Sequence, residues 1–321
     1  MGLVARVRRT IRERALLERG QTVLVAVSGG PDSTALLSVM ARVAPELGLR
    51  VLAAGIDHGL RAEAAAELDL AAARAAEVGV PFERRRIALE PGDGIQARAR
   101  HGRYAALAEI AARQGAARVA VGHTQDDQAE TVLSRVLRGG GLRGVAAIAP
   151  GRTDGIVRPL IDATRAEVRA YLDEHGIPFA SDPSNADDRF ERVRIRDRLL
   201  PALVAEDAHA VAHLAFLADE AREADQALEA LALRALADAT TPRGISLTVL
   251  QGAPAAVGVR ALREALGGAT LCRAHLSDLR RWLQEPREAS EVRLPGGRTA
   301  RIDGGHVVVS PTHDGDPREE A

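Results

Sequence analysis

Short apolar runs alternate with alanine-rich amphipathic stretches along the first half of the chain. The apolar runs predict buried strands at Val23–Val27, Val51–Ile56, Arg84–Leu89 and Arg118–Gly122. The amphipathic stretches predict helices at Arg6–Glu18, Ser33–Val43, Glu63–Val78, Ala97–Gln114 and Asp127–Leu137. Strand–helix alternation of this kind predicts an α/β fold, in which a parallel sheet carries helices on both of its faces.

The pattern changes near Leu199–Pro201. Beyond it, a long alanine- and leucine-rich helical stretch runs to about Ala239. Two shorter helices and three small strands joined by Gly-Gly turns are then expected: Val257–Leu266, Leu276–Gln284, Glu291–Leu294, Thr299–Ile302 and His306–Val309. We therefore expect a first domain over residues 1–203, a smaller and mainly helical domain over residues 204–311, and a frayed acidic tail over residues 312–321.

Composition narrows the function classes. The 321 residues suffice for two domains, and the net charge of −1 means that any nucleic-acid binding must come from local patches. The single cysteine, Cys272, excludes a disulfide framework and a cysteine-rich zinc site. Met1–Arg19 is arginine-rich without an apolar stretch, and no run reaches membrane-spanning length. We expect a soluble, cytoplasmic protein with no membrane partner.

The first polar motif, Ser28–Ser33, follows a buried strand and leads directly into a helix, with Pro31 suited to the first helical position. The backbone N–H groups of Gly29 and Gly30 and the hydroxyls of Ser28 and Ser33 suit a phosphate. A Walker loop needs a lysine, and all 43 basic residues of this chain are arginine. Because Asp32 would repel phosphates, we expect Mg²⁺ beside it. An ordinary strand-to-helix turn is the alternative that the full motif disfavours.

A second motif, Gly122–Thr131, combines His123 with three acids, Asp126, Asp127 and Glu130. Directly after a strand, such acids suit a metal or an ammonium-bearing substrate. Capping of the helix N-terminus would explain one of them. Ser28–Ser33, Asp57–His58 and His123–Asp127 all follow strands, so we expect them to share one crevice at the carboxyl edge of the sheet. Asp57 could serve a metal or a ribose, or neither.

Arginines gather in three places. A basic helix face at Ala97–Tyr104, which includes Arg103, is equally well explained as a solvated surface. A glycine-rich loop carries Arg138 and Arg143 and could contact a phosphate backbone or nothing. The densest group follows an Asp-Pro-Ser-Asn turn at 182–185 and consists of Arg189, Arg192, Arg194, Arg196 and Arg198. Its local acids cannot neutralise it, so contact with nucleic-acid phosphates is favoured.

The order of these motifs resembles the tRNA(Ile)-lysidine synthases of the PP-loop ATP-pyrophosphatase superfamily. The resemblance rests on seven segments within roughly the first two hundred residues: Ser28–Ser33, Asp57–Arg61, Ala99–Tyr104, Gly122–Thr131, Arg138–Gly144, Arg158–Leu160 and Asp182–Asn185. Two positions depart from the family pattern. Thr124 stands where a second histidine is frequent, and Val193 stands between arginines where asparagine is frequent, so neither is given a role.

The resemblance implies a two-step reaction. ATP would adenylate the C2 oxygen of the wobble cytidine in a tRNA(Ile) with a CAU anticodon, with release of pyrophosphate, and free L-lysine would then displace AMP. ATP would bind at Ser28, Gly29, Gly30, Pro31, Asp32, Ser33 and Asp57, with Mg²⁺ at Asp32. Catalysis would fall to Asp32, Arg103, His123, Asp127 and Glu130. tRNA would contact the C-terminal domain and Arg138, Arg143, Arg189, Arg192, Arg194 and Arg196. A homodimer is left open.

Three alternatives remain. A tRNA thiolase of the same superfamily would ordinarily use paired cysteines or an iron–sulfur cluster, which a chain with Cys272 alone lacks. An amide-forming ligase would leave the arginine group unexplained. A nucleotide-sensing module would bind ATP without releasing pyrophosphate.

Overall fold

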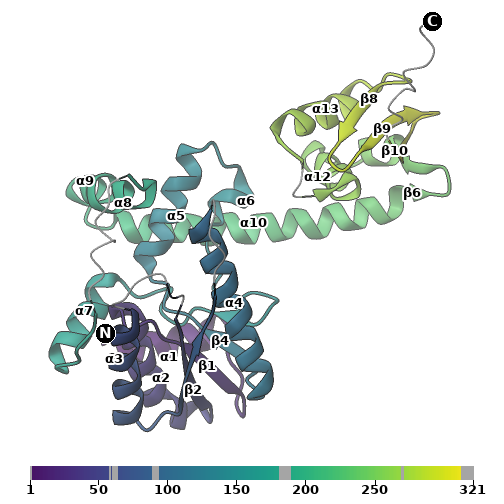
Figure 1. Ribbon diagram of the computed structural model, residues 1–321. Coiled ribbons are helices and arrows are strands. Elements are labelled where there is room, and N and C mark those ends of the chain that lie inside the picture. The colour runs from purple at the N-terminus through teal and green to yellow at the C-terminus, as the bar shows by residue number, and fades with distance from the viewer. Residues whose placement is uncertain are drawn as a thin grey trace, which may run out of the picture. The chain divides into compact units, whose positions relative to one another are not determined.

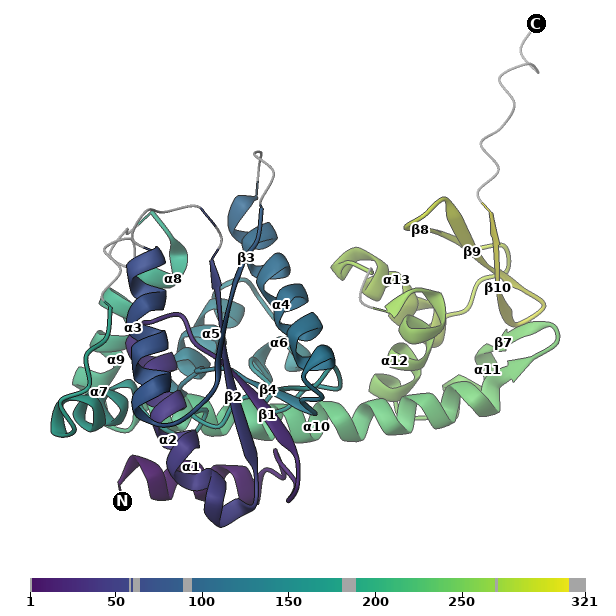
Figure 2. The same cartoon turned by 60° about the horizontal axis from the view of Figure 1, so that its bottom comes forward.

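The computed structural model describes residues 2–57, 59, 64–88, 94–180, 189–268 and 271–311. The chain divides into two compact units, Met1–Ala221 and Arg222–Ala321. This division falls within the long helix α10 (Ala210–Ala239), which therefore contributes residues to both units (Figures 1 and 2).

Unit 1 is built on a five-stranded parallel sheet in the order β3-β2-β1-β4-β5 (Figure 1). Its strands are β1 (Thr22–Ala26), β2 (Arg50–Asp57), β3 (Phe82–Arg86), β4 (Arg118–Ala120) and β5 (Ile156–Val157). Every pairing between them is parallel, so the carboxyl ends of β1, β2 and β4 lie along one edge of the sheet. The polar motifs that follow these strands are thereby brought to the same edge.

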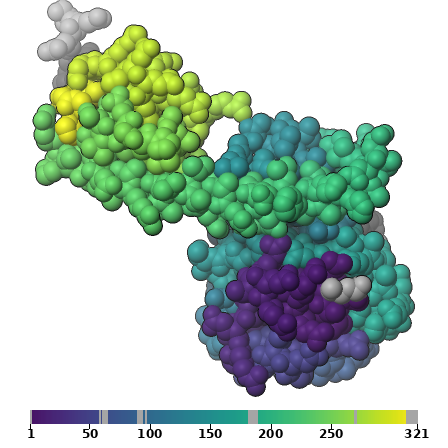
Figure 3. Space-filling view, turned by 180° about the vertical axis from the view of Figure 1, so that it is seen from behind, coloured from purple at the N-terminus to yellow at the C-terminus, as the bar shows by residue number. Residues whose placement is uncertain are grey.

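The apolar residues of the strands alternate between two cores, as the period of two in a strand requires. Val23 and Val25 of β1 face one core, whereas Leu24 faces the other. The first core is covered by α1 (Leu3–Glu13), α2 (Pro31–Leu47), α3 (Ala64–Glu77) and α7 (Arg165–Glu174). The second is covered by α4 (Ile95–Arg113), so helices lie on both faces of the sheet (Figure 2). The first residues of the chain, purple in Figure 3, form part of the surface of unit 1.

The rest of unit 1 is helical. After β4 come α5 (Gln125–Leu137) and the short α6 (Leu142–Val145). After α7 and a stretch outside the described residues come α8 (Glu191–Arg194), a π-helical segment at Ile195–Leu199 and α9 (Leu200–Glu206). The helical stretch expected after Pro201 is therefore interrupted near Asp207, before α10 begins.

Unit 2 packs helices against a small antiparallel sheet of order β6-β7-β10-β9-β8. Its helices after α10 are α11 (Leu247–Gln251), α12 (Ala255–Leu266) and α13 (Arg273–Gln284). Its strands are β6 (Thr240–Thr241), β7 (Gly244–Ser246), β8 (Glu291–Leu294), β9 (Arg298–Asp303) and β10 (His306–Pro311). Alternate residues of β8 and β9 enter a core that α12 and α13 complete with Trp282.

The predicted α/β class and the helical C-terminal region are confirmed. The sequence did not reveal β5, β6 and β7, because strands of two or three residues show no periodicity and these three, unlike β4, do not lie in a longer apolar run. Among the described residues no single helix has the length and apolar character needed to cross a membrane, although the bent pair Glu191–Glu206 and Ala210–Ala239 meets that criterion when its parts are combined.

Candidate active site

The Ser28–Ser33 loop is ordered by its own hydroxyls. Ser33 Oγ accepts a hydrogen bond from the Ser28 N–H at 3.0 Å and donates one to the Gly30 carbonyl at 3.1 Å. Gly29 has φ +85°, and a Cβ there would lie 2.4 Å from the Glu67 carbonyl oxygen of α3. Only glycine therefore fits this position. The following helix, α2, begins at Pro31 and its N-cap residue, Gly30, provides no side-chain hydrogen bond, so the first N–H groups of the helix suit an anion.

Asp32 lies in the first turn of α2, in surroundings that disfavour its negative charge. Its Oδ1 is buried and, among the described residues, has no hydrogen-bond partner. Burial, reinforced by the negative charge of Asp127, raises the pKa of Asp32 to about 6. A buried carboxylate oxygen without a donor fits a cation. No group of three or more potential metal ligands is found in the described part of the chain, so a cation here would take its other ligands from phosphate and water.

Thr124 is the N-cap residue of α5, and one of the acids that follow it takes part in capping this helix. Its side chain accepts from the Asp127 N–H, and Asp127 Oδ2 accepts from the Thr124 N–H at 2.8 Å, which completes a capping box. Asp126 Oδ2 accepts from the N–H of Arg165 at 2.7 Å, at the first turn of α7. Two of the three acids thus do capping work, whereas the sequence suggested one.

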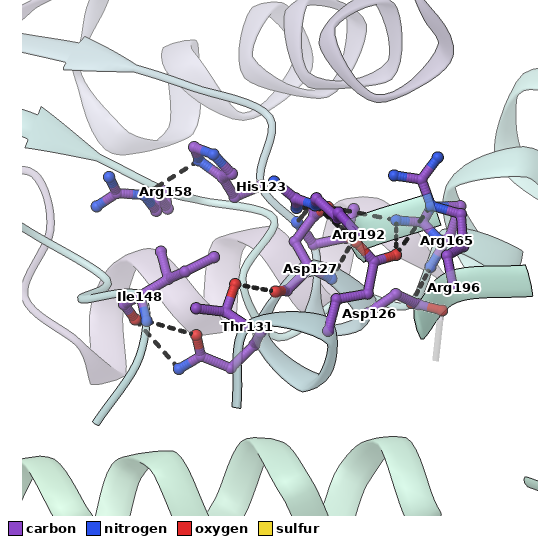
Figure 4. A network of polar contacts seen from close by, with 12 residues as sticks. His123, Asp126, Asp127, Thr131, Ile148, Arg158, Arg165, Arg192 and Arg196 are labelled. Atoms are coloured by element: carbon purple, nitrogen blue, oxygen red, sulfur yellow. Dashed lines mark hydrogen bonds and ion pairs between the residues drawn. The ribbon is translucent and has the colours of Figure 1, made fainter. Parts of the chain in front are cut away.

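The remaining carboxylate atoms belong to two buried acids and form a cluster with three arginines, which we call the acid–arginine cluster (Figure 4). Its members are Asp127, Glu130, Arg165, Arg192 and Arg196. Asp127 Oδ1 lies 2.7 Å from Arg192 Nη2 and 3.3 Å from Arg165 Nη2. Glu130, whose side chain is 0% exposed, contacts Arg165 at 2.9 Å, Arg192 at 2.8 Å and Arg196 at 3.1 Å. These charges come from three separate parts of the chain.

The cluster holds Asp127 in the charged state. Burial opposes ionisation of Asp127, but the guanidinium groups of Arg192 and Arg165 outweigh it and lower the pKa of Asp127. The same acids raise the pKa of Arg165 and Arg192 against the effect of burial. The two carboxylates therefore bind cationic groups, and in this structure those groups are the three arginines.

His123 follows Gly122 at the end of β4 and interacts electrostatically with Asp127 of the cluster. Its Nδ1 accepts a hydrogen bond from Arg158 Nε at 3.1 Å. Burial is the main cause that lowers the pKa of His123 to about 4, and nearby arginines add to it. The preceding Gly122 touches the start of α2, since a Cβ on it would lie 3.0 Å from the Asp32 carbonyl carbon. The end of β4 and the phosphate loop are thus in contact.

Three other predicted site residues, Asp57, Arg103 and Arg138, contact further parts of unit 1. Asp57 ends β2 and accepts from the Gly59 N–H at 2.8 Å, so its side chain caps a turn. Arg103 on α4 places its guanidinium 5.5 Å from the Tyr104 ring centroid. Arg138 pairs with Glu191 at 2.6 Å. Arg143, Arg189 and Arg194 are exposed.

The arginines of segment 191–199 fall on different faces of a helix. The segment 191–199 is helical, so Arg192 and Arg196, four residues apart, both reach Glu130, whereas Arg194 Nη1 donates to the Arg189 carbonyl at 2.8 Å. The partners of Arg192 and Arg196 are acids on α5, about sixty residues earlier, rather than local ones. Their contact with tRNA remains a prediction. His58 and the turn at 182–185 lie outside the described residues.

Two site residues escaped sequence reasoning. Arg165 follows Thr164, which caps α7 with Glu167 in a Thr-x-x-Glu pattern visible in the sequence, but that pattern gives no partner for Arg165. Arg158 lies in the segment Arg158–Leu160, which the sequence analysis used only as part of the resemblance to the family and gave no role. Its contact with His123 depends on the pairing of β4 with β5, a strand of two residues that no pattern reveals.

Residues 4–203 match the PP-loop domain family. A tRNA(Ile)-lysidine synthase of Thermobifida fusca is 40% identical over 312 residues, which cover 95% of each chain. One of Novosphingobium aromaticivorans is 38% identical over 95% of this chain and 94% of its own. One of Symbiobacterium thermophilum is 44% identical, and the match covers 74% of this chain and 51% of that relative.

Among solved structures, the U34-tRNA thiolase NcsA of Methanococcus maripaludis, with its [4Fe-4S] cluster, aligns with a TM-score of 0.57 at 14% identity. The alignment covers 68% of this chain and 78% of that one. At this identity the likeness concerns the fold alone.

Proposed function

Since the chain belongs to the tRNA(Ile)-lysidine synthase family of PP-loop proteins, which are ligases, we propose that it joins free L-lysine to the wobble cytidine of a tRNA(Ile) with a CAU anticodon. ATP would drive the reaction through an adenylated cytidine, and the products would be lysidine, AMP and pyrophosphate. The chain modifies tRNA as its relatives are named to do. The protein would act in the cytoplasm.

The observation that carries the proposal is the acid–arginine cluster beside the phosphate loop. Lysine brings ammonium groups that need carboxylate partners. Asp127 and Glu130 are buried carboxylates that already hold three cationic guanidinium groups. Arg192 is the most exposed of the three arginines, with 47% of its side chain accessible. We infer that an ammonium group of lysine takes the place of Arg192, which is then available to a tRNA phosphate.

Adenylation requires phosphates held in place and their charge offset. The Gly29 and Gly30 N–H groups, the Ser28 and Ser33 hydroxyls and the N-terminus of α2, which starts at Pro31, would hold the phosphates. The buried Oδ1 of Asp32 would hold Mg²⁺, which supplies charge neutralisation at the phosphates. Asp57 is proposed at the nucleotide, and Arg103 would offset negative charge in the adenylation transition state.

In the second step the ε-amine nitrogen forms a bond to C2 of the cytidine, and the bond between C2 and the adenylated oxygen breaks. The electron pair leaves with AMP. The attacking amine must lose a proton, and a carboxylate of the acid–arginine cluster is the proposed base.

The tRNA would lie against exposed arginines of unit 1 and against the C-terminal domain. Arg138, Arg143, Arg189 and Arg194 are exposed and would contact phosphates, and Arg196 would join them if it left Glu130. A homodimer remains a prediction.

The two steps can be separated experimentally. The protein is incubated with ATP labelled at the α-phosphate, Mg²⁺ and the CAU-anticodon tRNA, first without lysine. We expect labelled adenylate on the tRNA, and release of labelled AMP when lysine is added. A tRNA thiolase would release AMP with a sulfur donor instead of lysine, and a sensor would release no pyrophosphate. Either result would overturn the proposal.

A further inference from the structure

The buried Arg158 and the partly buried His123 form a pair to which the two reaction steps above give no specific task. Arg158 follows β5 directly, and His123 follows β4, its neighbour in the sheet. Arg158 is 3% exposed, and its Nε donates to His123 Nδ1 at 3.1 Å. Its Nη1 donates to the Ala149 carbonyl at 2.5 Å, which fixes the orientation of the guanidinium. Figure 4 shows the two side chains directed toward each other.

The chemistry of this hydrogen bond determines where the imidazole proton lies. A guanidinium has only donors and stays protonated, so the histidine nitrogen that it contacts must be an acceptor. Nδ1 therefore carries no proton, and the proton of a neutral ring is on Nε2. The described residues form no hydrogen bond with Nε2, which leaves that N–H for a ligand.

We propose that Arg158 is a positioning residue that fixes His123 as a neutral imidazole protonated at Nε2. The ring then serves as a hydrogen-bond donor to an anionic oxygen of the bound nucleotide, and not as a base. This proposal rests on the proposed function for the identity of the ligand, whereas the protonation state of His123 does not depend on it.

The charges around His123 favour the neutral ring. Asp127 on α5 favours the imidazolium, but Arg158 after β5, Arg100 on α4 and Arg192 on α8 oppose it, in addition to burial. A neutral ring at physiological pH follows from this balance.

The position of His123 points to the nucleotide as the acceptor. Gly122, one residue earlier, touches the backbone of Asp32 and Ser33, since a Cβ would lie 3.0 to 3.2 Å from their atoms. These residues form the first turn of α2, where the phosphates would bind. A neutral donor stabilises negative charge there and does not exchange its proton with the reactants.

The protonation state can be measured without substrates. NMR of the protein labelled with ¹⁵N-histidine, recorded from pH 5.5 to 8, reports the tautomer of each of the nine histidines. His123 is assigned from the signal that is lost in His123→Gln. We expect one neutral state with the proton on Nε2 throughout this range. A proton on Nδ1, or titration of His123 within the range, would overturn the proposal even if no other variant folds.

Variants then test the role of Arg158. In Arg158→Met we expect the Nδ1 resonance to leave its hydrogen-bonded position and the pKa of His123 to rise by about one unit. Arg152→Met removes an exposed arginine paired with Asp154 and should leave both unchanged. Unchanged His123 signals in folded Arg158→Met would show that the arginine has only a packing role.

Activity distinguishes a donor from a base. A glutamine amide donates a hydrogen bond but cannot accept a proton at neutral pH. His123→Gln should therefore keep the rate of tRNA adenylation within about tenfold of wild type, while His123→Ala loses about a hundredfold. Equal losses in the two variants would refute the donor role. If the wild type itself forms no adenylated tRNA, the proposed function is refuted. The NMR test of the His123 protonation state does not depend on that result.

Discussion

Replacement of Asp32 by asparagine should stabilise the protein without ligands, and more at pH 8 than at pH 5. The pKa of this carboxyl is about 6 in the fold and 3.8 in the unfolded chain. Because the folded value is the higher one, the protonated carboxyl stabilises the fold fully below pH 4, and this contribution is lost as the pH rises through 6. The full difference corresponds to about 3 kcal/mol.

Nearly half of this stabilisation is lost between pH 5 and pH 8, a range in which unfolding can be measured. At pH 5 the contribution of Asp32 is about 1.4 kcal/mol, and at pH 8 it is close to zero. Asparagine cannot ionise and has no such dependence. The free energy of unfolding of Asp32→Asn relative to wild type should therefore increase by about 1.4 kcal/mol between pH 5 and pH 8.

The assay is urea unfolding followed by far-UV circular dichroism at both pH values. Asp173→Asn, at an exposed position on α7, is the matched control and is compared with wild type at the same two pH values. The single tryptophan, Trp282, is buried in unit 2, so its fluorescence reports that unit separately. A stability difference between Asp32→Asn and wild type that is equal at pH 5 and pH 8 would refute the reasoning about the buried carboxylate.

Three further variants test other parts of the site. Asp127→Asn should raise the KM for lysine about tenfold or more while the Kd for ATP changes less than about threefold, and equal losses would contradict the lysine site. Arg192→Met should increase the affinity for lysine without tRNA about threefold or more in calorimetry, whereas the exposed control Arg194→Met should not; no increase would show that Arg192 does not compete with lysine. Gly29→Ala should cost at least about 1 kcal/mol more in unfolding free energy than Gly20→Ala, because both have positive φ but only Gly29 meets a main-chain oxygen, 2.4 Å away; equal costs would contradict the close packing of the loop.

The sequence predicted those features of the structure that depend on residues close together in the chain. The alternation of Val23, Leu24 and Val25 between two cores is the period of a strand buried on both faces. The two glycines and Pro31 placed a loop and a helix start correctly. Because parallel strands end at one edge, the sequence also predicted that His123 would lie near the phosphate loop.

The partners of the charged residues could not be predicted in the same way. Glu130 binds arginines from α7, α8 and the π-helical segment, and nothing local specifies that meeting. The density of arginines around Arg192, Arg194 and Arg196 suggested that all of them contact nucleic-acid phosphates. In a helix, however, the first and third share a face while the second points elsewhere. The lesson is that spacing has meaning only once the period of the backbone is known.

The most direct test of the account is the mass of the wobble nucleoside after reaction. The purified protein is incubated with ATP, Mg²⁺, L-lysine and a tRNA bearing a CAU anticodon, and the tRNA is digested to nucleosides for mass spectrometry. If the proposed function is correct, lysidine replaces one cytidine, and it forms only when both ATP and lysine are present. An unchanged wobble cytidine, under conditions in which the protein binds ATP and the tRNA, would contradict it.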